Sequence, residues 1–238
     1  MSGNIFLFIF LFSIFTGSGL YGIEPIDSES VLIKKYEQDT LKENQILYNG
    51  KLWRNHYYKI REDQFLFSKE FLSGNLSING QSFKNLNIRY DIYNDEIMIP
   101  TNHGAILQLN KEMIDSFTIN FNNKAYKFTK IQEDSVRGFN GYVNILFKGK
   151  NALYVKYKKE IEFLAVERKF DMFYQTHRIY FVKDSIVYQV TGKGDLLKVL
   201  NEDKVQIRNY IKKIKLKISK KRPESFIPVI DYYDSISQ

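Results

Sequence analysis

The stretch Leu76-Ser77-Ile78-Asn79-Gly80 decides how this chain folds, because it joins a short strand pattern directly to a two-residue turn. An Asn-Gly pair is the strongest short hairpin signal, since both central positions of a type I′ turn need a positive φ. The residues before this turn are therefore expected to form one strand, and those after it to return beside it. Similar turn signals follow at Asn94-Asp95, Asn122-Asn123, Lys148-Gly149-Lys150-Asn151 and Lys183-Asp184.

The connections at these turns are too short for parallel crossovers, which need a dozen or more residues. Successive strands therefore pair with their neighbours, and the pattern predicts a mainly β fold, an antiparallel meander of ten or more strands. A sheet of that size must form a sandwich or a curled sheet. The loop from Pro100 to Gly104 interrupts the pattern, but no linker divides the chain, so we expect a single β-rich domain over 23–238.

Aromatic residues make up 16% of the chain, with 17 Tyr and 19 Phe. Such side chains favour the half-buried surfaces of sheets, which predicts a core rich in aromatic rings. The alternative is that some rings, Trp53 among them, are exposed and stack on sugars.

The strand pattern gives way to a helical one near the C-terminus, and we expect a C-terminal amphipathic α-helical region at about 195–222. Asp195 is expected to cap a short helix through Leu200, and Asn201 a second one. Pro223 is expected to end the second helix. The tail after it is apolar enough to return as a strand or to dock. The apolar stripe of the second helix consists of Ile207, Ile211, Ile214 and Ile218, spaced 4-3-4.

The N-terminus carries an apolar run from Ile5 to Phe15, broken only by Ser13, ahead of the small residues 16–19. The run is about half of the roughly 20 residues that a membrane-spanning helix needs. We therefore predict a signal peptide over 1–22, cleaved after Gly19 or Gly22. The alternative is an uncleaved anchor that extends through residue 21.

The chain contains no cysteine, so its core is held without disulfides, and a lipoprotein acylated on an N-terminal cysteine is excluded. Small secreted eukaryotic domains usually depend on disulfides. Export without cysteine therefore favours a bacterial cell envelope.

The positive charge is concentrated in one segment, 193–222, which has eleven basic and three acidic residues. This excess of eight equals the formal net charge of +8 of the whole chain. A basic amphipathic helix is typical of proteins that meet an anionic lipid, glycan or protein surface, although lysines that simply face water give the same pattern. No nucleic acid is expected as a partner, since no recognised nucleic-acid module accompanies the patch. The candidate binding residues are Lys212, Lys213, Lys215, Lys217, Lys220 and Lys221.

The sequence contains no strong catalytic or metal-binding motif, and we predict no catalytic residue, no metal and no cofactor. The three histidines, His56, His103 and His177, lack metal-ligand spacing. The oxygen-rich segment 91–96 does not match an EF-hand loop, and turn chemistry explains its Asn94-Asp95 pair. The segment 191–195 lacks the full spacing of a phosphate-binding P-loop.

Three short segments of the chain carry a resemblance to known proteins: Leu47-Tyr48-Asn49-Gly50-Lys51-Leu52-Trp53, Leu86-Asn87-Ile88-Arg89-Tyr90-Asp91-Ile92-Tyr93 and Tyr232-Tyr233-Asp234. They resemble segments of uncharacterised secreted proteins common in Bacteroidetes-type bacteria. The resemblance covers most of the mature chain and implies a periplasmic or outer-membrane-associated location. That family carries no assigned activity, so no functional residue is transferred.

These observations support two hypotheses from different classes. The first is an exported, non-enzymatic envelope protein that binds or scaffolds an envelope component, located in the periplasm, at the outer membrane or outside the cell. The second is a hydrolase that acts on an envelope polymer or glycan. The hydrolase requires a cleft that gathers His103 or His177 with carboxylates, whereas the binding protein requires an exposed basic or aromatic face.

If residues 1–22 are a signal peptide, the chain expressed in a bacterial host is shortened to a form that begins near Leu20 or Ile23. Mass spectrometry of the mature N-terminus, read after cell fractionation, measures this directly. An intact N-terminus in a membrane fraction that high salt does not release would make the apolar run an anchor instead.

Overall fold

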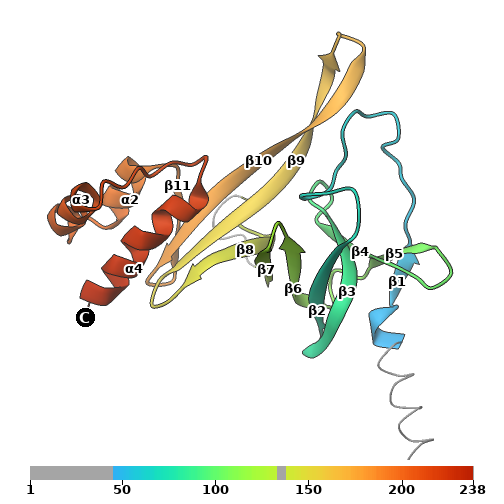
Figure 1. Ribbon diagram of the computed structural model, residues 1–238, viewed down its shortest axis with the longest axis horizontal. Coiled ribbons are helices and arrows are strands. Elements are labelled where there is room, and N and C mark those ends of the chain that lie inside the picture. The colour runs from blue at the N-terminus through green and yellow to red at the C-terminus, as the bar shows by residue number, and fades with distance from the viewer. Residues whose placement is uncertain (1–44, 133–137, 238) are drawn as a thin grey trace, which may run out of the picture. The chain divides into compact units, whose positions relative to one another are not determined.

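Residues 43–238 form one compact unit, and the computed structural model describes residues 45–132 and 138–237 (Figure 1). The predicted signal peptide lies outside the described residues. The strands are β1 Gly50–Leu52, β2 Leu72–Ile78, β3 Gln81–Asp91, β4 Glu96–Pro100, β5 Ile106–Leu109, β6 Ile114–Phe121, β7 Lys124–Ile131, β8 Gly141–Lys148, β9 Ala152–Val166, β10 Phe170–Lys183 and β11 Ile186–Val190. The helices are α2 Lys193–Val199, α3 Lys204–Lys213, the 3-10 helix η1 Pro223–Phe226 and α4 Ile227–Ile236.

The described strands form one 11-stranded sheet in the order β1-β5-β4-β3-β2-β6-β7-β8-β9-β10-β11. All its neighbours pair antiparallel, which confirms the predicted mainly β fold and antiparallel meander. The meander is interrupted at two places: β1 pairs with β5 and not with β2, and β6 returns to pair with β2 and not with β5. The chain from β6 onward extends the sheet on the opposite side of β2.

The predicted turns adopt the conformations that their residues favour. Asn79 and Gly80 have φ of 48° and 79°, as a type I′ turn requires, and they join β2 to β3. Asn122 and Asn123 join β6 to β7 with φ of 49° and 58°. Asn is among the few residues that enter this region at low cost, so the local sequence is sufficient to place these hairpins.

The sheet curls, so that strands distant in its order pack against one another. The ring of Tyr90 in β3 lies 5.1 Å from that of Phe117 in β6, 5.4 Å from Phe128 in β7 and 5.9 Å from Tyr142 in β8. Phe117 and Phe128 are themselves stacked at 4.6 Å. All four rings are buried, as the prediction of an aromatic core required. Edge-to-face and offset contacts of this kind stabilise a core beyond their buried area.

The C-terminal helices cover one face of β9, β10 and β11 and form a second core with it (Figure 1). Leu153 and Val155 of β9 and Ile179 and Phe181 of β10 alternate toward this face and are fully buried. The helices contribute buried residues that pack against these strand side chains: Leu196, Leu197, Ile207, Ile211, Val229, Ile230 and Tyr233.

The predicted helical extent of about 195–222 is wrong at its C-terminal end, because α3 ends at Lys213. Lys215 has a φ of 50°, the Lys215 amide donates to the Lys212 carbonyl, and the Leu216 amide donates to the Ile211 carbonyl at 3.1 Å. These two bonds form a Schellman motif, which ends a helix, here with lysine where glycine is usual. Pro223 accordingly begins η1 instead of ending α3.

The predicted apolar stripe is only partly right, and the predicted N-cap of the second helix is wrong. Ile207 and Ile211 are buried, but Ile214 is 41% exposed and lies beyond the helix. Asn201 is not the N-cap of α3, which is Asp203.

The tail docks as helix α4. Tyr232 of α4 stacks on Tyr210 of α3 with ring centroids 4.0 Å apart. Asp234 accepts hydrogen bonds from the Asn151 side chain at 2.5 Å and from its backbone amide at 3.2 Å. Asn151 lies in the β8–β9 turn, so α4 is attached to both the helices and the sheet.

Replacing Ile230 with alanine tests whether α4 is part of the cooperative core. We expect Ile230→Ala to lower the free energy of unfolding by about 2–5 kcal/mol, because it removes a fully buried side chain and leaves a cavity. Urea denaturation measures this. Asp231→Ala, at the adjacent exposed position, serves as the control and should change the free energy of unfolding by less than about 0.5 kcal/mol.

Candidate functional site

The six candidate lysines lie on the chain that links α3 to η1. We call residues 212–222 the basic strap. Lys212 and Lys213 are the last residues of α3, and the other four lie outside any helix. The side chains of Lys212, Lys213, Lys215, Lys217, Lys220 and Lys221 are all exposed.

The basic strap is held by backbone contacts, although it contains no helix beyond Lys213. Ser219 pairs with Gly192 in an isolated β-bridge, which ties the strap to the start of α2. The amide of Ser219 donates to the hydroxyl of Ser225 at 3.0 Å, and the amide of Arg222 donates to the carbonyl of Ser219 at 2.9 Å. Leu216 and Ile218 pack against the second core, whereas the lysines of the strap face water.

The charge of the basic strap is not neutralised within the described residues. None of its six lysines takes part in an ion pair there. No acidic residue occurs between Asp203 and Glu224, and Glu224 itself pairs with Lys124 at 2.7 Å. An open hollow of about 550 Å³ lies on the strap, lined by Lys215, Lys217 and Arg222 among others.

A polar cleft of about 410 Å³ lies beside the strap. Its charged lining comes from β9, β10, the β3–β4 turn and the strap, and consists of Asp95, Lys156, Lys158, Glu160, Arg178 and Lys220. The face of the β9–β10 hairpin opposite the helices carries the side chains of Lys156, Lys158 and Arg178. Lys220 reaches the same cleft, so the strap and the sheet present basic groups together.

His177 also lines this cleft, but its ring is already engaged. The side chain of His177 lies on the face of β10 that the helices cover, and its Nε2 is 2.7 Å from the Lys220 carbonyl oxygen. Of the carboxylates in the cleft, Glu160 accepts from Lys158 at 3.0 Å and from the Tyr174 hydroxyl at 2.8 Å. The cleft lining thus includes His177 and two carboxylates, and no hydrogen bond between the histidine and either carboxylate is described.

The other two histidines lie elsewhere. His103 is exposed in the turn between β4 and β5. His56 lines a separate hollow beside Trp53. One ring face of Trp53 is approached by the Arg89 guanidinium at 4.8 Å, which competes with the predicted use of this ring as a sugar platform.

Asp95 is the centre of a half-buried network that connects the β3–β4 turn to β9. Its Oδ1 accepts from the Tyr90 hydroxyl at 2.5 Å and from Lys156 Nζ at 2.9 Å, and its Oδ2 accepts from the Tyr142 amide at 3.2 Å. Burial raises the pKa of Tyr90 well above its ordinary value, and Asp95 raises it further. Burial also lowers the pKa of Lys156, while Asp95 opposes that change.

The oxygen-rich segment 91–96 is used for the turn. Asp91 is buried and accepts from the amides of Tyr93 and Asn94 at 2.8 and 2.9 Å, and from the Asn94 side chain at 2.9 Å. Burial raises the pKa of Asp91, and these hydrogen bonds oppose the rise. Within the residues described, no three His, Cys, Asp or Glu side chains are grouped as metal ligands.

The predicted cap at Asp195 is also wrong. Asp195 lies inside the first turn of α2, and its Oδ2 accepts from the Thr191 amide at 2.9 Å and the Thr191 hydroxyl at 2.6 Å. These bonds close the loop before the helix instead of capping helix amides.

Sequence reasoning missed Lys156, Lys158 and Arg178 as a group. The alternation of lysine with Val155 and Tyr157 indicates that both lysines share one strand face. Their proximity to Asp95 follows only from the curl of the sheet, which no local pattern shows.

The chain matches no protein-family model, no curated protein and no solved structure. No helix in the described ranges is long and apolar enough to cross a membrane.

Replacing Asp95 with asparagine tests the network. Asp95→Asn leaves Lys156 charged and largely buried without its counter-charge, so we expect the free energy of unfolding to fall by about 3 kcal/mol or more. Urea denaturation measures the change. Glu224→Gln removes a partner from an exposed ion pair and should cost at most about 1 kcal/mol. Equal effects of the two substitutions would contradict a structural role for the Asp95 network.

Proposed function

We propose that this chain is an exported, non-enzymatic envelope protein that binds or scaffolds an anionic component through its basic strap. The observation that carries the proposal is the set of six exposed lysines, held on an ordered segment and without an ion pair in the described ranges. Lysines near an anionic membrane contribute roughly 1 kcal/mol each, so a cluster of this size is sufficient for reversible binding.

The arrangement of the strap favours binding over a purely solvated surface. Lysines on a helix end and an adjoining loop present charge in several directions, and Lys220 extends this charge to the neighbouring cleft. The backbone bonds of Ser219 restrict the strap before a partner arrives, which reduces the entropy lost on binding.

Export is part of the proposal and is supported by the predicted signal peptide, and the absence of cysteine in an exported chain favours a bacterial envelope. The partner is an envelope component with a negative surface: an anionic lipid, an acidic glycan or an acidic protein.

The hydrolase alternative has weaker support. His177 lines a cleft with Asp95 and Glu160, but each of these three side chains already has a different hydrogen-bond partner. General base catalysis requires a histidine or carboxylate within hydrogen-bond reach of the reacting proton.

Co-sedimentation with vesicles that contain an anionic phospholipid tests the proposal, with neutral vesicles and a soluble acidic polysaccharide as separate arms. Lys215→Gln with Lys217→Gln should weaken binding by about 10- to 30-fold, because two charges are lost. Binding of the parent chain should also fall steeply as salt is raised.

The matched control is Lys84→Gln with Lys127→Gln, which removes two exposed lysines of β3 and β7, outside the strap. The control should bind like the parent chain. If both double variants lose affinity equally, only net charge matters and the strap is not the binding surface.

A further inference from the structure

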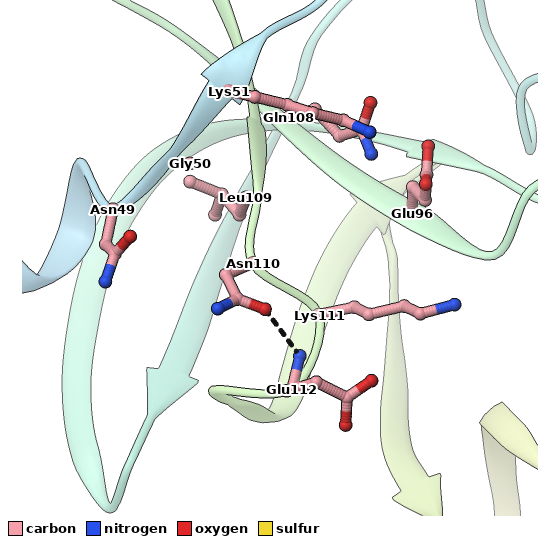
Figure 2. Close-up of a pocket in the computed structure, with 9 residues that line it drawn as sticks. All are labelled: Asn49, Gly50, Lys51, Glu96, Gln108, Leu109, Asn110, Lys111 and Glu112. Atoms are coloured by element: carbon pink, nitrogen blue, oxygen red, sulfur yellow. Dashed lines mark hydrogen bonds between the residues drawn. The ribbon is translucent and has the colours of Figure 1, made fainter.

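A second hollow, of about 390 Å³, lies away from the basic strap between β1, β4, β5 and the turn that leads into β6 (Figure 2). Gly50 lets β1 lie close to β5 beside this hollow, because a Cβ at position 50 would collide with the Gln108 carbonyl oxygen. The close approach of β1 to β5 places Lys51 directly opposite Gln108. The polar side chains that line the hollow include Lys51, Glu96, Gln108, Asn110, Lys111 and Glu112.

Some of these groups already have partners. Asn110 Oδ1 accepts from the Glu112 amide at 3.1 Å. Glu112 pairs with Lys130 at 3.0 Å, and this contact lowers the pKa of its carboxyl. These bonds lie on the lower side of the hollow in Figure 2. The side chains of Asn110 and Glu112 are therefore already hydrogen-bonded within the protein.

The other polar groups are available for a ligand. Within residues 45–132 and 138–237, the side chains of Glu96, Gln108 and Lys111, and that of Lys51, form no hydrogen bond or ion pair. Figure 2 shows these four side chains around one opening. The hollow therefore offers one carboxylate, one amide and two ammonium groups.

Glu96 is the group that most needs a ligand. It is half-buried, and burial raises the pKa of its carboxyl, as does nearby Asp91, while Lys51 and Lys111 oppose the rise. Because no described protein group donates to this carboxylate, its oxygens can accept hydrogen bonds from a ligand in the hollow. A ligand ammonium group placed beside Glu96 would supply both donors and a counter-charge.

We propose that this hollow binds a free amino acid, with the ligand ammonium group on Glu96 and the ligand carboxylate between Lys51 and Lys111. A ligand with only an ammonium group would bind Glu96 but leave the charges of the two lysines without a counter-charge. A ligand with only a carboxylate would pair with the lysines but donate no hydrogen bond to Glu96. The volume lies at the lower end of the range for small-molecule sites, which suits a ligand of this size. The proposal does not depend on the anionic partner of the strap.

Titration of the full chain with L-alanine, acetate and methylammonium, followed by NMR or calorimetry, tests the proposal. L-alanine should bind saturably with a dissociation constant near or below about 1 mM. Acetate and methylammonium, which carry one group each, should bind at least about tenfold more weakly. Glu96→Gln and Lys111→Ala should each weaken L-alanine binding about tenfold or more, as expected for one lost charged hydrogen bond.

Glu202→Gln and Lys84→Ala are the matched controls, because both side chains are exposed and remote from the lining residues. They should leave L-alanine binding unchanged, as should the Lys215 and Lys217 substitutions in the basic strap. Acetate binding as tightly as L-alanine, full affinity in Glu96→Gln that unfolds like the parent chain, or no saturable L-alanine binding would each overturn the proposal.

Discussion

The curl of the sheet around Tyr90 is the constraint on which the rest of the structure depends. In the sheet order, β3 and β9 are separated by β2, β6, β7 and β8, yet Asp95 at the end of the β3–β4 turn pairs with Lys156 of β9. The buried rings around Tyr90 bring these strands together, and the ion pair closes the contact. The same turn carries Asp95 into the polar cleft, which therefore depends on the curl, and it places the adjacent Glu96 beside the hollow of Figure 2.

The two candidate sites have different electrostatics, which leads to different partners. The basic strap carries one sign of charge and no described ion pair, an arrangement that suits an extended anionic surface and is sensitive to salt. The hollow combines available groups of both signs in a confined volume, and it therefore favours a small ligand that carries both charges. A protein with both features would hold itself at a surface through the strap and bind a small solute at a separate position.

Much of the fold followed from the sequence, because its signals are local. Asn79-Gly80 and Asn122-Asn123 tolerate positive φ, so the hairpins at these positions were predictable. The end of the second helix was not. Lys215 adopts a conformation that glycine normally supplies, because Leu216 and Ile218 beyond it pack on the second core and Ser219 pairs with Gly192. A helix continued to residue 222 would forgo these contacts, and tertiary packing thus overrides the helical spacing of the isoleucines.

The sequence by itself determined the antiparallel hairpins, the aromatic character of the core and the concentration of basic charge near the C-terminus, since each depends on residue type and short-range spacing. The pairings of β1 with β5 and of β6 with β2 join strands that are not successive, and short-range spacing did not predict them. Only the tertiary structure decided which charges meet. Lys156 joins Asp95 because the sheet curls, and Lys51, Glu96 and Lys111 line one hollow because Gly50 lets β1 approach β5. These are contacts between positions far apart in the chain, and they arise from packing that no single segment encodes.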